Sequence, residues 1–364
     1  MACSSLKPVQ GLKTAASNGN ERGLERMEKE WKQTLYTYVN QYNQLQIDYR
    51  SQQGEQVVTD PGYLMAKAER SFRLSQWYEA RGARPLRSET RAKLLRTIQD
   101  APDQAVVDVQ LHVQLIYEKG GVTHAEETIQ RERLTLIRDG DDWVIVSVEH
   151  LTPEKHPSAA GIDVLAEPQQ SGYPSYGSSP QPYLNPYILG GGINRKSVRY
   201  RREEAAAYAD RWWNSYNPEF AVFDVDCTNY ISQCLFAGGA PINYTGRRET
   251  GWWYKGYVGG KEWWSYSWAV SNALSAFLAA STWGTRGELV ERPEQLMLGD
   301  VIFYDWDGDG SFQHSTIVTA FDAGGQPLVN AHTVSSRHRY WDYRDSYAWT
   351  ENTAYRFLHI PDYF

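Results

Sequence analysis

The sequence predicts a two-domain protein of the α+β class, and three observations lead to this prediction. Near the N-terminus, apolar residues recur at helical spacing and then change to a strand-like alternation. A stretch rich in Pro, Gly, Ser and Tyr follows, and a second helix-then-strand region comes after it. The length of 364 residues suits two ordinary domains. We therefore expect a disordered tail at 1–22, an α+β domain at 23–151, a flexible linker at 152–195 and a second α+β domain at 196–364.

The first domain opens with helical periodicity. Apolar side chains recur every three or four residues over 24–45, which places one apolar stripe on a helix, and a second helix is expected around 64–77. Apolar and polar residues then alternate over 107–115, the pattern of a half-buried strand. Further strands are expected at 129–137 and 143–148, joined by a tight turn. Helices followed by an antiparallel sheet define an α+β domain.

The second domain repeats this order of helices and strands. Helices are expected at 205–213, from Cys227 to the glycines at 238–239, and at 268–278. Strands are expected at 301–304, 316–321 and 328–331. A helix followed by a sheet is the order found in papain-like folds.

Composition and charge narrow the functional class. The hydrophobic content of 41% and the charged content of 22% are typical of a soluble globular protein. The net charge of −7 argues against a nucleic-acid binder. No apolar run is long enough to span a bilayer, and residues 1–7 lack the apolar core of a signal peptide. The chain as written is therefore expected in the cytoplasm, or it is a mature or trimmed form of an exported protein.

The three cysteines do not form a disulfide framework. Cys227 and Cys234 are seven residues apart, which on a helix is roughly 10 Å, more than the Cα separation that a disulfide allows. Cys3 lies in the expected tail. The cysteines and histidines lack the spacing of a zinc site, and we expect no cofactor.

Cys227 is the strongest candidate nucleophile. It stands where a polar stretch ends and helical periodicity begins, so its thiol is expected at a helix N-terminus. The helix dipole and the free N–H groups there favour the thiolate and could also hold an oxyanion. Cys234 falls two turns inside the same helix, on its apolar face, and is expected to be a buried, inert side chain.

A thiolate nucleophile needs a base and a group that orients the base. His314 begins an expected strand, which places an imidazole at a sheet edge facing the helix N-terminus. Asn330 and His332 are two residues apart on the next strand and point to the same face. Either residue could direct the second ring nitrogen of His314.

The segment from Asp226 to Gly239 resembles the nucleophile segment of a bacterial family of putative amidase domains. That family is similar to the NlpC-type and CHAP-type cell-wall peptidases. The resemblance spans roughly residues 197 to 361, and it includes further motifs at 208–214, 265–268, 298–304 and 331–333. In the first domain, residues 138–145 resemble the last hairpin of SnoaL-like cone folds, and no catalytic set is visible there.

The resemblance implies a papain-like cysteine amidase or peptidase that works through a thiol acyl-enzyme. Cys227 would attack the carbonyl and His314 would protonate the leaving amine. His332 would orient His314 as in the NlpC-type enzymes, and Asn330 is the rival because CHAP-type enzymes use Asn or Glu near this place. Asp226 is expected to make a turn or to cap the helix, and not to react.

The substrate implied by the resemblance is a peptide or N-acyl amide. Cell-wall peptide (peptidoglycan) is the natural choice by analogy, and it would place the protein outside the cell or in the cell wall. Two alternatives stay open from the residues alone. The domain could be an inactive binding module on the same fold, or it could transfer the acyl group to an amine.

Two further motifs have functional interpretations beside plainer ones. Asp305, Asp307 and Asp309 alternate like the ligands of a calcium loop, although the position that should supply the last acidic ligand is Thr316. The plainer interpretation is a polar hairpin tip. The tryptophans, above all Trp252 and Trp253, could form a substrate wall, or they could belong to the core. Trp268 and Asp226 complete the candidate substrate-binding set.

Overall fold

The computed structural model describes residues 19–48, 56–152, 154–155, 197–258 and 261–364. It has helices and one large antiparallel sheet, so the predicted α+β class is confirmed. Residues 1–18 of the expected tail and most of the expected linker lie outside the described residues. Residues 19–22, which were also expected in the tail, belong to a helix, and the other domain boundaries stay predictions.

Two helices and four strands make up the N-terminal half. Helix α1 is Gly19–Ile47 and helix α2 is Pro61–Arg81. The apolar stripe of α1 buries Trp31, Tyr38 and Tyr42, as its periodicity predicts. Helix α2 begins after Asp60, whose side chain accepts a hydrogen bond from a main-chain N–H of the first turn, and ends at Gly82 in the left-handed conformation.

The N-terminal strands are longer than the sequence predicts. They are β1 (Ala83–Asp100), β2 (Gln104–Lys119), β3 (Val122–Asp139) and β4 (Asp142–His150), joined as antiparallel neighbours. Strand β1 has no counterpart in the prediction. Its second half is exposed on both faces, so its sequence carries no alternation of apolar and polar residues.

The C-terminal half places its helices before most of its strands. The helices are α4 (Arg202–Trp212), α5 (Cys227–Ala237), α6 (Tyr266–Ala269) and α7 (Ser271–Ala280), with a short 3-10 turn η3 at Pro293–Gln295. A two-stranded hairpin is formed by β5 (Tyr254–Val258) and β6 (Lys261–Trp264). The main-sheet strands are β7 (Glu288–Val290), β8 (Val301–Asp305), β9 (His314–Phe321), β10 (Pro327–Ala331), β11 (Ser335–Tyr340) and β12 (Ala354–His359). The single helix expected over 268–278 is broken between α6 and α7, where Val270 is extended.

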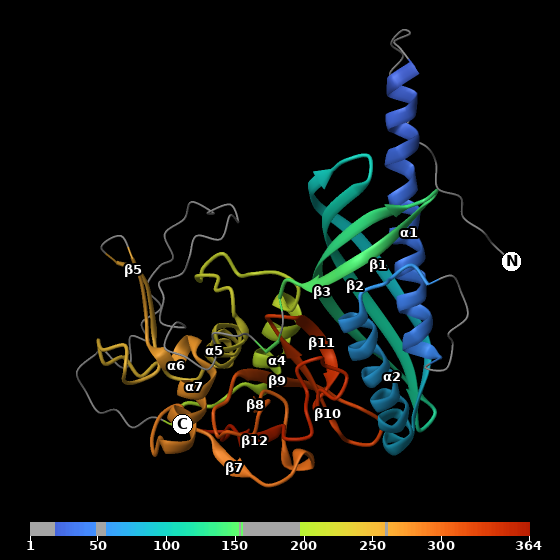
Figure 1. The fold of residues 1–364 in the computed structure, drawn as a ribbon. Coiled ribbons are helices and arrows are strands. Elements are labelled where there is room, and N and C mark those ends of the chain that lie inside the picture. Colours follow the sequence, from blue (N-terminus) through green and yellow to red (C-terminus); the bar gives the residue numbers. More distant parts are fainter. Residues whose placement is uncertain (1–18, 49–55, 153, 156–196, 259–260) are drawn as a thin grey trace, which may run out of the picture.

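A single sheet runs through both halves of the molecule (Figure 1). Its order is β1-β2-β3-β11-β10-β9-β8-β12-β7, with β4 also paired to β3. The junction is the antiparallel pair of β3 and β11, in which Ser335 lies opposite Ile129 and Arg337 lies opposite Glu127. The two halves are therefore joined by main-chain hydrogen bonds.

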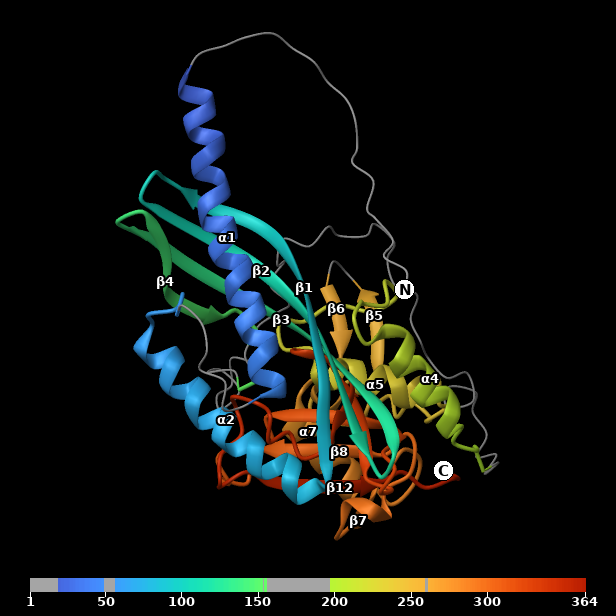
Figure 2. The same cartoon turned by 90° about the vertical axis from the view of Figure 1, so that its right-hand side faces the viewer.

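Side chains reinforce this junction. The indole of Trp77 on α2 donates a 2.8 Å hydrogen bond to Asp342, and the Arg81 guanidinium lies 3.6 Å from the centre of the Tyr340 ring. Arg339 on β11 pairs with Glu154 and Asp345, all of them largely buried. Figure 2 shows α2 running alongside the C-terminal strands. We use the name junction for these contacts and the β3–β11 pair together.

The C-terminal part of the sheet separates two cores. The core on one face includes Ile231 and Leu235 of α5 and Ile317 of β9. The core on the opposite face includes Tyr304, Trp306 and Tyr343 with Val318 of β9. Helix α5 thus packs against the strand that begins at His314, which positions the candidate site.

Candidate active site

Cys227 is the first residue of α5, as the sequence predicts. The first N–H groups of a helix have no acceptor within the helix, so the thiol stands beside unpaired donors. Asp226 precedes it, and Oδ1 of its buried carboxylate accepts hydrogen bonds from the Phe223 N–H (3.1 Å) and the Asn229 side-chain amide (2.9 Å). These bonds fix the start of the helix and hence the nucleophile.

His314 opens β9 and is surrounded by aromatic rings. It lies opposite Tyr304 on β8, and the ring centres of Tyr304, Trp306 and Tyr343 are 5.5, 5.8 and 5.4 Å from its own. Among the described residues, neither ring nitrogen of His314 has a hydrogen-bond partner. We call the three rings the aromatic cage. The cage takes the place where an orienting amide, imidazole or carboxylate was expected.

The environment of Cys227 lowers the pKa of its thiol to about 7, below the ordinary value of 9.0. Burial is the largest single influence and raises this pKa, while the adjacent His314 ring lowers it. The Thr228 hydroxyl and the Ser315 N–H lower it further, and that hydroxyl lies 3.7 Å from the sulfur. The imidazole is close enough to act on the thiol, although the two groups do not form a regular hydrogen bond. The structure therefore brings together the expected nucleophile and base.

The thiol pKa of Cys234 is shifted in the opposite direction. This side chain is fully buried on the apolar face of α5, and burial raises the pKa of its thiol well above the ordinary value. The expectation that this side chain is buried is met.

Both members of the pair are closed to solvent in this structure. Cys227 and His314 are each 1% exposed. An extended substrate can reach the sulfur only after covering groups move aside.

The two residues expected to orient His314 make other contacts. His332 Nδ1 lies 2.7 Å from Asp226 Oδ2, and its Nε2 lies 2.8 Å from the Trp212 carbonyl oxygen. The Asn330 side chain donates to Asp210 and accepts from Thr319 and from the His338 N–H. Both residues face α4 and α5, and their side chains make these hydrogen bonds instead of bonding to the imidazole of His314.

The loop of alternating aspartates is held by hydrogen bonds to its own main chain. The buried Asp305 carboxylate accepts hydrogen bonds from the main-chain N–H groups of residues 307, 308, 309 and 310. Asp307 pairs with Lys155, and Asp309 accepts from the Ser311 N–H. Among the described residues, no three His, Cys, Asp or Glu side chains converge as metal ligands. Asp305 thus shapes the hairpin that leads into His314, in agreement with the plainer interpretation.

The tryptophans proposed as a substrate wall belong to the core. Trp252, Trp253 and Trp268 are each 0% exposed. The Trp252 and Trp268 indoles donate to Ser232 and Asn229 on α5. The expectation of a substrate wall is corrected here, because these rings support the helix that bears the nucleophile. The sequence of two adjacent tryptophans does not indicate whether their rings lie in the core or line a substrate site.

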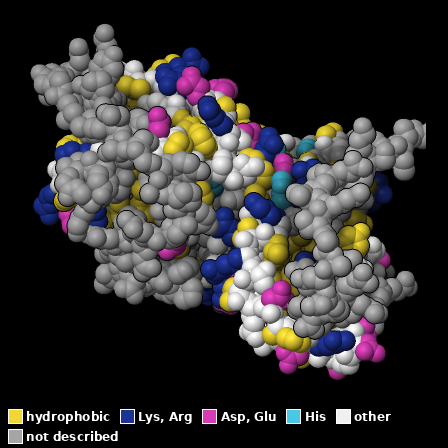
Figure 3. Space-filling model, turned by 90° about the horizontal axis from the view of Figure 1, so that it is seen from above, with side chains coloured by type: hydrophobic (Ala, Val, Ile, Leu, Met, Phe, Trp, Pro, Cys, Tyr) yellow, Lys and Arg dark blue, Asp and Glu magenta, His cyan; other side chains and the backbone are white. Residues whose placement is uncertain are grey.

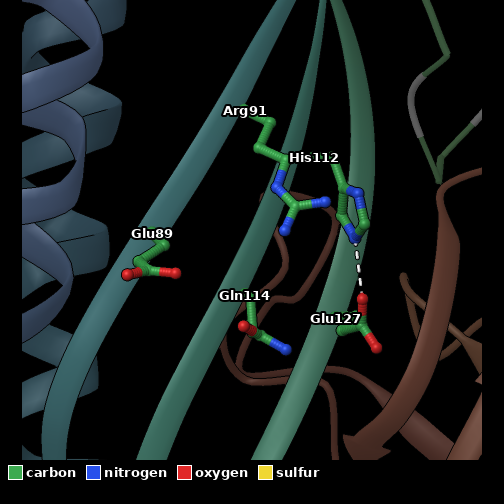
Figure 4. Close-up of a pocket in the computed structure, with 5 residues that line it drawn as sticks. All are labelled: Glu89, Arg91, His112, Gln114 and Glu127. Atoms are coloured by element: carbon green, nitrogen blue, oxygen red, sulfur yellow. Dashed lines mark hydrogen bonds and ion pairs between the residues drawn. The ribbon is translucent and has the colours of Figure 1, made fainter. Parts of the chain in front are cut away.

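A shallow pocket lies on the N-terminal part of the sheet, on the face that also carries α4. It is lined by Glu89, Arg91, His112, Gln114 and Glu127, and His112 Nε2 lies within hydrogen-bond distance, 2.8 Å, of Glu127 Oε2 (Figure 4). On the face seen from above, the described basic and acidic side chains are interspersed (Figure 3). The sequence does not single out this pocket.

Comparison with known proteins finds a family match in the C-terminal half of the chain. Residues 199–358 match the family model described as "Putative amidase domain". These residues are thus similar to that family. The matched residues include Cys227, His314 and the third-residue candidates. The expected likenesses to NlpC-type and CHAP-type peptidases and to SnoaL-like folds stay predictions.

A curated relative also matches part of the chain. The uncharacterized protein YhbB of Bacillus subtilis (strain 168) is 48% identical over 167 residues, which cover 46% of this chain and 52% of that protein. The chain thus spans about half the length of this relative. No solved structure matches. The described helices include none with the length and apolar character of a membrane span.

Proposed function

We propose that the C-terminal half of the chain, matched over residues 199–358, hydrolyses an amide or peptide bond, with Cys227 as nucleophile and His314 as general base and acid. One observation carries the proposal. Two buried cysteines lie on one helix, and only the cysteine beside a histidine at the helix N-terminus has a lowered thiol pKa, about 7. Perturbed pKa values of this kind cluster at functional sites.

The reaction balances over two steps. The Cys227 sulfur attacks the carbonyl carbon while His314 takes the thiol proton, and the free N–H groups at the start of α5 stabilise the oxyanion. His314 then gives the proton to the leaving amine, which leaves a thioester on Cys227. Water attacks the thioester, His314 accepts and returns one proton, and the acid departs as the thiol reforms.

The substrate we propose is a peptide or N-acyl amide, with cell-wall peptide as the first class to test. Support comes from the family description, which names an amidase. The buried pair requires that the substrate or a neighbouring segment opens the site, which favours a substrate with binding groups beyond the scissile bond. A substrate in the cell wall would place the protein outside the cytoplasm.

Trapping the acyl-enzyme tests this function. The full chain is mixed with peptide and N-acyl amides, including peptidoglycan fragments, and quenched at low pH for intact-mass spectrometry. A mass increase equal to the acyl group, located on Cys227 and absent in Cys227→Ala, supports the proposal. Product release without a Cys227 adduct, undiminished in Cys227→Ala, contradicts it. Faster loss of the adduct to added amines than to water would identify acyl transfer instead.

A further inference from the structure

Tyr343, one of the three rings of the aromatic cage, has an unusual backbone conformation. Its φ of 57° lies in the left-handed region, which a bulky side chain seldom adopts and which persists only where the surrounding structure holds it. The ring is 0% exposed, its centre lies 5.4 Å from that of His314, and its hydroxyl lies 3.1 Å from the Ser336 hydroxyl. The contacts that hold the backbone here therefore also decide where this ring meets His314.

The residues that follow Tyr343 are held by arginines of α2. Arg73 donates through Nε to the carbonyl oxygen of residue 344 at 2.7 Å and through Nη2 to that of residue 346 at 2.9 Å. Arg70 donates through Nε to the carbonyl oxygen of residue 345 at 2.6 Å. We name residues 342–349 the clamped segment. Three consecutive carbonyl groups of this segment thus accept hydrogen bonds from α2.

The donors on α2 share one face of the helix. Arg70, Arg73 and Trp77 are three and four residues apart, which places their side chains in one row. The Trp77 indole donates to Asp342, the first residue of the clamped segment. The guanidinium groups of Arg70 and Arg73 also lie over aromatic rings of the segment, 5.4 and 5.1 Å from the ring centres. Because the clamped segment belongs to no helix or strand, its conformation depends on such contacts.

We propose that α2 positions the imidazole of His314 through the clamped segment, with Arg70 and Arg73 as positioning residues. Held in place, the Tyr343 ring keeps this imidazole where it acts on the Cys227 thiol. The N-terminal half thereby sets the reactivity of a nucleophile that lies in the C-terminal half. This inference rests on the proposed function for the role of Cys227, but the positioning of His314 does not depend on it.

A buried cation supports the same ring from β11. The Arg339 guanidinium lies 3.8 Å from the centre of the Tyr343 ring and pairs with the Asp345 carboxylate at 2.9 Å. Because Arg339 is buried and contacts the ring directly, its loss would disturb the fold as well as the cage. Arg70 and Arg73 are only half-buried and bond to the main chain of the clamped segment, so their substitution tests the positioning with less damage to the core.

Methionine removes the guanidinium group and keeps much of the length of the side chain. The double variant Arg70→Met/Arg73→Met should move the pH midpoint of iodoacetamide labelling of Cys227 upward by about one unit. The thiolate fraction at pH 7 should then fall roughly fivefold. The midpoint is the readout, because it reports on the thiol and its histidine whether or not the site also becomes more open.

Two comparisons separate positioning from a general loss of structure. Arg84→Met is the matched control, because this arginine lies in the same half and pairs with Glu118 at the surface. Its midpoint should equal that of the wild type. Tyr343→Leu removes the ring through which the arginines act, so adding Arg73→Met to it should shift the midpoint no further. A purely structural role would give additive losses of stability and leave the midpoint unmoved.

The deciding experiment adds carbon-13 NMR of the full chain with ring-labelled histidine, assigned by His314→Gln. The His314 resonances, which the aromatic cage shifts, should move in the double variant and stay in Arg84→Met. Unmoved resonances would overturn the proposal, and so would a labelling midpoint that stays near 7 in wild type and variant alike. Arg73→Met alone removes two of the main-chain bonds and gives the same test if the double variant does not fold. If wild-type Cys227 has a midpoint near 9 while the resonances still move, the proposed function fails and the positioning of His314 stands.

Discussion

Cys227 and Cys234 are seven residues apart on α5, and their environments shift the pKa values of their thiols in opposite directions. Both side chains are buried, so burial alone cannot explain the difference. The His314 ring, the Thr228 hydroxyl and the Ser315 N–H act on Cys227. Cys234 is surrounded by the apolar core between α5 and the sheet.

Substitution of each cysteine by alanine should separate catalysis from stability. Cys227→Ala should abolish amide hydrolysis and keep the fold, because a small side chain at the start of a helix contributes little packing. Cys234→Ala should keep activity and lower the free energy of unfolding by about 1–2 kcal/mol, because it leaves a small cavity. Activity assays and urea unfolding of both variants check this. An active Cys227→Ala protein would show that another residue is the nucleophile.

The stability of the protein should depend on pH through Cys227. Its pKa is about 7 in the folded protein and about 9.0 as an ordinary thiol, so its stabilising contribution is present above the higher value and is lost as pH falls through the lower one. The free energy of unfolding of wild type minus that of Cys227→Ala should therefore rise by about 2–3 kcal/mol from pH 6 to 10. Urea unfolding across this range measures the difference. Cys234→Ala is the control and should give the opposite sign above pH 9, because burial raises the pKa of Cys234. A flat difference for Cys227→Ala would exclude a lowered thiol pKa.

The aromatic cage should hold His314 in place. Trp306 is fully buried and stacks on the His314 ring with planes 24° apart. Trp306→Leu should cost about 2–4 kcal/mol of stability, and it should slow turnover more than Trp306→Phe, which keeps an aromatic face. The control is Trp283→Leu, since Trp283 is 69% exposed. Equal turnover in Trp306→Leu and Trp306→Phe, measured well below their unfolding temperatures, would argue against an orienting role for the cage.

The junction should make the stability of the C-terminal half depend on the N-terminal half. Arg339→Leu strands the buried carboxylates of Glu154 and Asp345 and should cost about 3–5 kcal/mol. Arg84→Ala breaks the exposed pair with Glu118 and should cost no more than about 1 kcal/mol. Thermal unfolding of both variants makes the comparison. Similar losses would mean that the junction does not couple the two halves energetically.

Periodicity and helix-end signals in the sequence predicted the parts of the site that are local in the chain. Cys227 begins α5 because a polar stretch gives way to helical spacing there, and Cys234 is buried because it lies on the apolar face of that helix. His314 begins a strand for similar local reasons.

Such local patterns could not predict contacts between residues that are distant in the chain. The pairing of His332 with Asp226 joins residues 106 positions apart, so nothing local distinguishes it from a bond to His314. The core position of Trp252 likewise depends on a distant contact, because its indole bonds to Ser232 of α5. The β3–β11 pair likewise joins two strands that the sequence analysis assigned to separate domains.

The most direct test of the central claim, that His314 activates the Cys227 thiol, is the pH dependence of iodoacetamide labelling, mapped by mass spectrometry. In the native protein, labelling of Cys227 should rise with a midpoint near pH 7, as its lowered thiol pKa requires, and Cys234 should stay unlabelled. His314→Ala should move the Cys227 midpoint toward the ordinary thiol value. A Cys227 midpoint near 9 in the wild type, unchanged in His314→Ala, would contradict the claim.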